Sequence, residues 1–467
     1  MDYQLLIGGT LVPGASTLEV VNPATGRVFA QAPRADEAQA EQAIAAARRA
    51  FPVWAALGYA ERGAFLERLA AAIEVRAEDF ARILTLEQGK PLDQARGEVA
   101  ASVSAFAYYA QQQLEPRVLR ETAQERIVEQ RYPLGVVAAI TPWNYPLLLL
   151  AVKMAPALVT GNVLIAKPAP STPLATLLLG EVAASVLPAG VFQTLTDAND
   201  LGALLSRHPG VAHVSFTGST PTGRKVLASA ADTLKRFTLE LGGNDAALVL
   251  DDADIATIAP HIYSGATTNS GQVCLAIKRV YVPRGKVDAL CDALAELARA
   301  AVIGDGMVQG TTIGPIQNRT QFEKVQAYIA EAREQGTIVA GGAPVPGEGF
   351  FIAPTIVRDL PDDARLVREE QFGPVLPVQA YDDLDAAVAQ VNASEYGLAA
   401  SIWTGDAERG LAVASRVECG TVWVNRHLDL PWDVPFGGAK QSGIGRQQGV
   451  EGMEDFTQPR IVNMALV

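Results

Sequence analysis

Residues 135–170, GVVAAITPWNYPLLLLAVKMAPALVTGNVLIAKPAP, contain two short apolar runs separated by a longer one. GVVAAI and NVLIAKP have the length and apolar character of buried strands, and residues 147–159 between them are numerous enough for a helix. A strand, a helix and a second strand in this order predict a βαβ unit with parallel strands. The stretch therefore indicates an open α/β sheet covered by helices.

The same alternation continues along the chain. VFQTLT and HVSFTG are predicted as further strands of the first sheet, with helices at 173–186 and 199–208. A second series has predicted strands RVYVP, VLPVQAY, AASIWT and GTVWVN, and predicted helices at 254–270, 286–301 and 384–391. The expected fold class is α/β, with two tandem open, mostly parallel sheets joined near 239–250. Ala-rich residues 37–110 are expected to form amphipathic helices on the first sheet, and charged residues 115–131 an arm with β character.

Composition narrows the class of protein. A chain of 467 residues exceeds the usual size of one core, so more than one domain is expected. The net charge of −13 argues against binding to nucleic acid or to an anionic membrane. The most lipid-like run, 146–161, is interrupted by Lys153 and Pro156 and is too short to span a bilayer. Three cysteines, four histidines and no metal-ligand spacing predict a reducing, cytoplasmic setting without a metal site.

Two features at predicted strand ends are typical of nucleotide binding. HVSFTG runs into Gly218-Ser219-Thr220-Pro221-Thr222-Gly223, where a strand-to-helix turn lets backbone amides approach a pyrophosphate. The spacing is not that of the dinucleotide fingerprint, so a plain tight turn is the alternative. Lys167 follows a strand and could reach a ribose or a phosphate, or be a solvated lysine at a strand end.

Three side chains are candidates for a direct role in catalysis. Asn144 lies between two prolines at the end of GVVAAI, where its amide could donate to an anion or close an ordinary turn. Glu240, in LELGGN, is either a buried general base with a raised pKa or a structural acid. Cys274 ends NSGQVC with no histidine within ten residues, so it is either a nucleophile or a small buried apolar residue.

Together these pieces resemble the aldehyde dehydrogenase superfamily over essentially the whole chain. Seven motifs occur in the family's order: PWNYP, KPAPSTP, FTGSTPTG, LELGGN, NSGQVC, EEQFGPV and PFGGAKQSGIGR. The resemblance implies a cofactor domain at 1–111 and 134–242 and a catalytic domain at 243–441. It also implies an oligomerisation arm at 112–133 and 457–467, with 442–456 returning to the cofactor domain, and a homodimer or homotetramer.

By this resemblance Cys274 is the nucleophile, and Cys291 and Cys419 are structural. Asn144 and the Cys274 backbone amide would hold the oxyanion, and hydride transfer would leave a thioester. Glu240 would activate the water that releases the acid, which favours hydrolysis over acyl transfer to coenzyme A. Lys153 matches a lysine proposed for proton relay in some members.

The implied cofactor is NAD, with NADP as the alternative. The implied cofactor-binding residues are Thr141, Trp143, Lys167, Gly218, Ser219, Leu241, Glu370 and Phe372. Two positions depart from the family pattern. Pro170 stands where many NAD-preferring members have a ribose-binding glutamate, so a 2′-phosphate would meet less repulsion. Gln447 stands where a second candidate base is frequent, and an amide cannot take up that proton.

The implied substrate tunnel is apolar and partly aromatic. Its predicted residues are Tyr145, Leu148, Leu149, Val152, Val273, Leu275, His427 and Trp432. This lining favours an aliphatic, terpenoid or aromatic aldehyde, although the same side chains could simply pack a domain interface. The alternatives are a coenzyme A-acylating or semialdehyde-type dehydrogenase, or a retired enzyme with a structural role.

Overall fold

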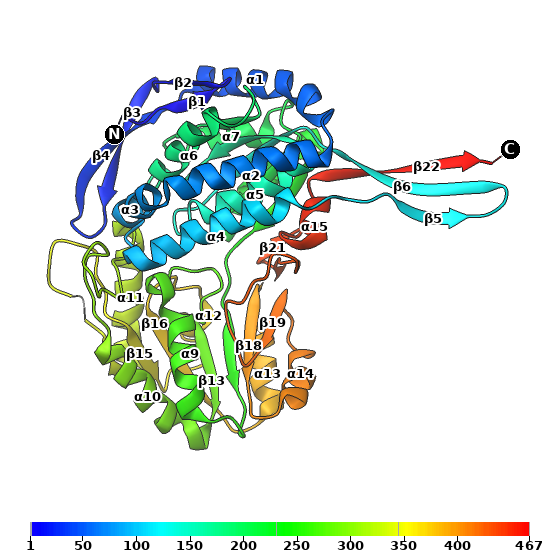
Figure 1. Ribbon diagram of the computed structural model, residues 1–467. Helices are drawn as coiled ribbons and strands as arrows, with labels where there is room; N and C mark the ends of the chain where they lie inside the picture. Colours follow the sequence, from blue (N-terminus) through cyan, green and yellow to red (C-terminus); the bar gives the residue numbers. More distant parts are fainter. Residues whose placement is uncertain (1, 230, 344, 467) are drawn as a thin grey trace.

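The computed structural model of the protein describes residues 2–229, 231–343 and 345–466. Two open α/β sheets form an upper and a lower half in Figure 1, and a three-stranded β arm projects from the upper half. The predicted fold class is confirmed. The outer ends of the predicted domain 1–111 and of the predicted arm segment 457–467 are residues 1 and 467, which lie outside the described residues.

The first sheet has six strands, of which five are parallel. In spatial order they are β21 (Gly443–Ile444), β11 (Arg236–Glu240), β10 (His213–Thr217), β7 (Val136–Ile140), β8 (Val163–Lys167) and β9 (Phe192–Thr194). Only the edge strand β21 runs antiparallel, next to β11. Every residue of β7 and β8 is buried, so both faces of the sheet are covered.

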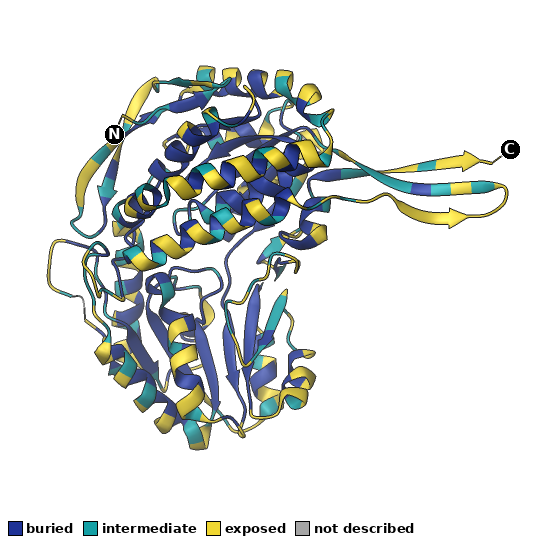
Figure 2. Ribbon diagram, in the orientation of Figure 1, coloured by how far each residue is buried: buried dark blue, intermediate teal, exposed yellow. Residues whose placement is uncertain are grey.

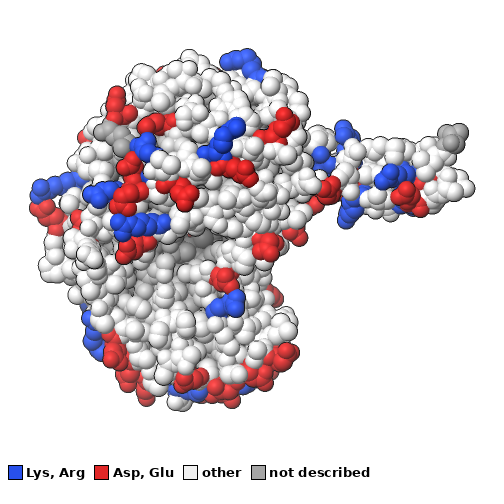
Figure 3. Space-filling view, viewed as in Figure 1, with Lys and Arg blue, Asp and Glu red and all other residues white. Residues whose placement is uncertain are grey.

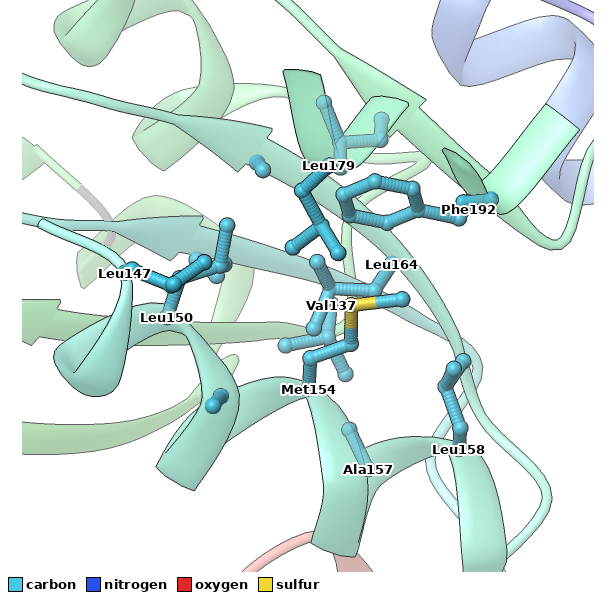
Figure 4. Close-up of a cluster of buried hydrophobic side chains, with 14 of the residues drawn as sticks. Val137, Leu147, Leu150, Met154, Ala157, Leu158, Leu164, Leu179 and Phe192 are labelled. Carbon is cyan, nitrogen blue, oxygen red and sulfur yellow. The ribbon is translucent and has the colours of Figure 1, made fainter. Parts of the chain in front are cut away.

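The helices of the upper half cover this sheet. They are α1 (Glu37–Ala55), α2 (Tyr59–Val75), α3 (Ala77–Gln88), α4 (Leu92–Ala110), α5 (Leu148–Val159), α6 (Leu174–Ala184), α7 (Leu201–Arg207), α8 (Thr220–Ser229) and α15 (Gly449–Glu454), with the 3₁₀ turn η1 (Ala231–Thr233). Figure 4 shows Met154 of α5 lying among Val137 of β7, Leu164 of β8 and Phe192 of β9. This contact between α5 and the sheet fixes the loop 141–147, which carries Asn144.

The second sheet has seven strands. In spatial order they are β14 (Thr337–Ala340), β15 (Thr355–Arg358), β16 (Val375–Tyr381), β13 (Arg279–Pro283), β12 (Ala246–Val249), β18 (Ala399–Trp403) and β19 (Thr421–Val424). All neighbours are parallel except β14, which runs antiparallel to β15. Ala247 and Val249 of β12 face one core and Ala246 and Leu248 face another, so this sheet is also covered on both sides.

The helices of the lower half pack on these two faces. They are α9 (Ile255–Thr267), α10 (Val287–Ala300), α11 (Arg319–Gln335), α12 (Arg365–Arg368), α13 (Leu384–Asn392) and α14 (Ala407–Ala414), with the 3₁₀ turns η2 (Thr268–Gly271) and η3 (Arg284–Lys286). The elements that were not predicted include α11, α14, β14 and β15. These segments are short or carry a strongly polar exposed face, so their apolar residues stand out less than those of the fully buried elements.

The remaining strands form hairpins and the arm. They are β1 (Leu5–Ile7), β2 (Thr10–Val12), β3 (Ser16–Asn22), β4 (Arg27–Arg34), β17 (Tyr396–Gly397), β20 (Ala439–Lys440), β5 (Arg117–Glu121), β6 (Glu125–Pro133) and β22 (Thr457–Ala465). In the arm β22 pairs antiparallel with β6, which pairs with β5. Figure 2 shows that the arm is mostly exposed, in contrast to the buried sheets. Residues 125–133 of the predicted arm therefore pair with the C-terminal strand within one chain.

Candidate active site

Cys274 lies in a sharp reversal of the chain between α9 and β13. The preceding residues Asn269, Ser270 and Gly271 all have positive φ, at 52°, 57° and 72°. A Cβ on Gly271 would collide with the backbone carbonyl of Gly373, so glycine is required there. Helix α9 ends at Thr267, so the prediction that it continues to residue 270 is wrong.

Tertiary hydrogen bonds explain that early end. Asn269 Nδ2 donates to the backbone oxygens of Asn144 at 3.1 Å and of Gln272 at 3.3 Å. Ser270 Oγ donates to the Gly314 backbone oxygen at 2.8 Å. These bonds draw both side chains away from a helical path, and in this reversal the residue Cys274 keeps only partial exposure to solvent.

Asn144 approaches the cysteine from the first sheet. Its side chain is 3% exposed, and its Nδ2 donates to the Gln272 backbone oxygen at 2.9 Å. Gln272 lies two residues before Cys274, so this bond ties the loop after β7 to the cysteine segment. In the described part of the chain, the second hydrogen of this amide and the backbone N–H of Cys274 have no acceptor.

A cavity of about 190 Å³ contains both residues. It is lined by Pro142, Trp143, Asn144, Thr217, Gly218, Ser219, Leu241, Gly242, Cys274, Gln321, Lys324, Glu370 and Phe372. A groove of about 520 Å³ shares Pro142, Trp143, Thr217, Gly218 and Ser219 with this cavity and extends past Thr141 to Lys167. Figure 3 shows the surface hollowed between the two halves, with few charged side chains in the hollow. One continuous slot therefore leads from Lys167 to Cys274.

The slot fits an extended ligand with a central anionic group. Gly218 and Ser219 form the turn between β10 and the N-terminus of α8, where backbone dipoles favour an anion. The Thr141 hydroxyl lies on the groove, is buried and has no hydrogen-bond partner among the described residues. A Cβ on Gly242 would lie 2.5 Å from Glu370 Oε2, so the glycine leaves room for that carboxylate.

Glu370 and Phe372 close the slot from the second sheet. Glu370 Oε1 accepts a 3.0 Å hydrogen bond from the Gly243 amide and lies 3.8 Å from Lys278 Nζ. Burial raises the pKa of the Glu370 carboxyl above its usual value, and Lys278 opposes this shift. The Phe372 ring meets the Trp143 ring edge to face, with centroids 5.3 Å apart. The aromatic pair bridges the two halves beside the cavity.

Glu240 ends β11, level with Thr217 of β10. It is 4% exposed, and neither carboxyl oxygen has a hydrogen-bond partner among the described residues. Burial raises its pKa to about 8, against the opposing charges of Lys153 and Arg446. Glu240 lies close enough to Cys274 to act on it electrostatically, but it is not among the residues that line the cavity.

Lys153 lies behind Glu240 on α5 and is completely buried. Burial lowers its pKa to about 7, while the Glu240 charge opposes that shift. Its Nζ donates to the Ser215 hydroxyl at 3.2 Å. Glu240 and Lys153 are therefore two buried groups that both titrate near neutral pH.

Burial also makes the Cys274 thiol a weak acid in this structure. Its pKa is raised to about 12, because burial and the nearby carboxyls of Asp245, Glu370 and Glu240 outweigh the charge of Lys278. The thiol is consequently protonated at neutral pH, and attack requires a base or an added positive charge.

The eight predicted tunnel residues fall into two groups. Val273 and Leu275 belong to one small apolar cluster, against which Tyr145 and Cys274 also pack. His427 joins it through a 2.6 Å hydrogen bond from its Nε2 to the Leu275 backbone oxygen. The other predicted tunnel residues, Leu148, Leu149, Val152 and Trp432, pack on the core of the first sheet instead.

The two departures from the family pattern have clear positions. Ala169 lines the groove, and Pro170 beside it does not. Gln447 is buried, its backbone pairs with Phe436, and its amide Nε2 has no partner among the described residues. Neither position supplies a charge to the slot.

Two buried lysines near the site were not predicted. Lys278 Nζ donates to the backbone oxygens of Cys274 at 2.5 Å and Val273 at 3.0 Å. Lys90 forms a buried ion pair with Glu98 and lies 3.5 Å from the centre of the Tyr145 ring. A lysine is usually exposed, so no local signal distinguishes these two from surface residues.

Neither a membrane-spanning helix nor a metal-binding cluster is found in the described residues. None of the helices described combines the length and apolar character needed to cross a bilayer. Within residues 2–229, 231–343 and 345–466, no group of three or more His, Cys, Asp or Glu side chains is arranged to hold a metal ion.

Comparison with known proteins agrees with the fold and the motifs. The sequence profile of the Aldehyde dehydrogenase family matches residues 11–462. A betaine aldehyde dehydrogenase of Rhizobium leguminosarum bv. trifolii is 39% identical over 461 residues, covering 97% of this chain and 94% of the relative. Aldehyde dehydrogenase LUC3 of a Fusarium species is also 39% identical, covering 98% of both chains.

Solved structures give the same result. The NAD⁺ complex of an aldehyde dehydrogenase from Bacillus cereus superposes with a TM-score of 0.97 at 35% identity, covering 100% of this chain and 97% of that one. An NADP-dependent enzyme from E. coli superposes with a TM-score of 0.97 at 36% identity, covering 100% and 98%.

Proposed function

The chain belongs to the aldehyde dehydrogenase family and is an oxidoreductase acting on aldehydes, and from this premise we propose that it converts an apolar aldehyde to the carboxylic acid through a thioester on Cys274. The observation that carries the proposal is the shared cavity. Cys274 and Asn144 lie at one end of a slot whose other end reaches Lys167, so a carbonyl group and an extended coenzyme can meet at the sulfur.

In the first step the Cys274 sulfur bonds to the aldehyde carbon and the thiol loses its proton. The thiol pKa is about 12, so loss of this proton to water needs an added positive charge beside the sulfur, which the ring of a bound NAD⁺ or NADP⁺ would supply. The oxyanion that forms accepts hydrogen bonds from the Asn144 amide and the Cys274 backbone N–H, the two donors with hydrogens to spare.

After oxidation, Glu240 supports hydrolysis of the thioester. Its carboxylate takes a proton from water, and the resulting hydroxide attacks the thioester carbon and releases the acid and the thiol. Lys153 keeps part of the Glu240 population ionised because its charge opposes the effect of burial. The same two donors again hold the oxyanion.

A dinucleotide fits the slot on this chain's own residues. Thr141 and Lys167 would offer donors to a ribose at one end, and the turn at Gly218 and Ser219 would hold the diphosphate. Trp143, Leu241, Glu370 and Phe372 surround the end next to Cys274. When bound there, NAD⁺ or NADP⁺ supplies the acceptor for the hydride. The chain's part is to hold the aldehyde carbon beside that acceptor.

The substrate is proposed to be an aliphatic, terpenoid or aromatic aldehyde. The cluster beside Cys274 consists mainly of the apolar side chains of Val273, Leu275, Trp423 and Phe436, which suits an apolar substrate chain. A quaternary-ammonium aldehyde is the second candidate, because a 39%-identical relative is named betaine aldehyde dehydrogenase. The Tyr145 ring supports this candidate less, because Lys90 already lies over it.

A panel of aldehydes tests the proposal directly. Apolar, semialdehyde and quaternary-ammonium aldehydes are incubated with NAD or NADP, with and without coenzyme A, and the acid is quantified by mass spectrometry. We expect acid from apolar aldehydes without coenzyme A, and none from Cys274→Ala. A requirement for coenzyme A, or a preference for charged semialdehydes, would refute the corresponding part of the proposal. No oxidation of any aldehyde would favour a structural role.

The arm is proposed to join two copies of the chain as a homodimer, on its own or within a homotetramer. Ile461 and Met464 on β22 and Val118 and Leu119 on β5 are exposed apolar side chains on an extended element. A three-stranded ribbon has too little core of its own to account for these apolar side chains. A second copy is the partner that would cover them.

A further inference from the structure

A buried ion pair lies beside the groove, at the end far from Cys274. Lys167 Nζ and Asp197 Oδ1 are 2.7 Å apart, and their side chains are 4% and 0% exposed. The other carboxyl oxygen of Asp197 accepts a 2.8 Å hydrogen bond from the Leu201 amide at the start of α7. One oxygen of Asp197 is therefore held by a hydrogen bond and the other lies against the Lys167 ammonium, and Asp197 does not line the groove.

The pair determines how much charge this end of the groove offers. Lys167 and Lys225 are the two lysines that line the groove. The Lys167 charge is already compensated by Asp197, whereas Lys225 is exposed on α8 and its charge is screened by water. A paired ammonium still has hydrogens to donate to neutral hydroxyls, but it attracts an additional anion weakly.

NAD and NADP differ at this end of the molecule. NADP carries a phosphate on the 2′-oxygen of the adenosine ribose, where NAD has a hydroxyl. A phosphate needs a cation without a closer counter-ion, or several donors, to replace its hydration. Lys167 beside Asp197 supplies a donor without net charge, which suits the hydroxyl.

We propose that Asp197, by pairing with Lys167, makes this chain select the coenzyme with an unphosphorylated adenosine ribose, that is NAD over NADP. The inference rests on the proposed function, in that it assigns the groove to the adenosine end of the coenzyme. Asp197 is a specificity residue that acts through Lys167, since it is too deeply buried to touch the ligand itself. Its carboxylate would take the place of the glutamate that many NAD-preferring family members have at position 170, where this chain has proline.

Isothermal titration with 5′-AMP and 2′,5′-ADP isolates this end of the coenzyme, and NAD and NADP serve as full-length probes. For the wild type we expect AMP and NAD to bind at least about tenfold more tightly than their phosphorylated counterparts. Asp197→Asn keeps an acceptor for the Leu201 amide and frees the Lys167 charge. It should reduce the AMP to 2′,5′-ADP affinity ratio by about tenfold, mainly by tighter binding of 2′,5′-ADP.

Asp200→Asn is the matched control. Asp200 lies three residues further on, pairs with the partly exposed Arg34 at 2.7 Å and does not line the groove. It should leave the ratio unchanged, and thermal unfolding without ligand should show that both variants fold.

Three results would overturn the inference. The wild type could bind 2′,5′-ADP as tightly as AMP. Asp197→Asn could leave the AMP to 2′,5′-ADP affinity ratio unchanged. The wild type could instead prefer NADP and lose that preference when Lys225 is replaced by Met. Binding of both nucleotides without discrimination would leave the proposed function standing and remove only this inference. Failure to bind any of the four nucleotides would remove the proposed coenzyme as well.

Discussion

Lys90 holds the backbone of Asn144: its Nζ donates a 2.9 Å hydrogen bond to the Asn144 carbonyl in a fully buried environment. The same ammonium pairs with Glu98 and lies over the Tyr145 ring. Glu98 in turn accepts hydrogen bonds from the amides of Leu147 at 3.0 Å and Leu148 at 3.2 Å. One buried ion pair thus connects α4, and the turn that precedes it, to the loop that presents Asn144.

Replacing Lys90 by Met should destabilise the fold by about 3–5 kcal/mol, because Glu98 would remain buried without its counter-charge. Urea unfolding followed by circular dichroism measures this loss. The double variant Lys90→Met/Glu98→Gln removes both charges and should recover part of the stability. If the single variant unfolds at the same urea concentration as the wild type, the pair does not support the loop.

Replacing Asn144 by Ala should lower kcat/KM by about 10²–10³-fold, because one of two donors to the oxyanion is lost. Steady-state kinetics with the best aldehyde of the panel measures the loss. Titration with the dinucleotide is the control and should change little, since the groove is left intact. An unaltered kcat/KM would exclude the Asn144 amide from oxyanion binding.

Glu240→Gln should still give one turnover of reduced coenzyme and then turn over about 10²–10⁴-fold more slowly, because an amide cannot take the proton of the attacking water. Rapid mixing separates the burst from the steady rate. In the wild type the carboxyl is protonated below its pKa of about 8 and ionised above it. The deacylation rate should therefore rise as pH rises through about 8, and this rise should be absent from the variant. A wild-type rate that is flat between pH 6 and 9 would contradict the assignment.

Replacing Ile461 by Asp should weaken self-association, because a charge would enter the apolar surface that the arm is proposed to bury. Analytical ultracentrifugation at several protein concentrations should show a smaller species than the wild type. Val308→Asp changes an equally exposed apolar residue far from the arm in sequence and should have no effect. Equal masses for all three proteins would refute the proposed contact.

Much of the architecture was predictable because each βαβ unit is marked by local apolar patterns. Residues 135–140 and 147–159 form β7 and α5 to within one residue, since both elements are buried on every side and carry continuous apolar runs. The polar α11 and the edge strand β14 were missed for the opposite reason. The end of α9 was misjudged because the side chains of Asn269 and Ser270 bond to residues distant in sequence.

Some residues of the candidate site could be predicted from sequence motifs and others could not. The motifs identified Cys274, Asn144 and Glu370, because each lies where a strand or helix meets a loop with a recognisable pattern. They could not identify Lys90 or Lys278, whose partners are backbone oxygens of residues brought near by folding. They also could not show that Trp432 lies against Ser104 of α4, outside the apolar cluster beside Cys274.

The sequence alone determined the fold class, the family, and the residues with suitable chemistry for each step, because these depend on periodicity and on motifs within short windows. Only the tertiary structure decided the electrostatic state of those residues. Lys167 and Asp197 are thirty positions apart in sequence and 2.7 Å apart in space. Whether a charge is exposed, paired or desolvated depends on such distant neighbours, so the charge that the slot presents to a ligand can be read only after the chain has folded.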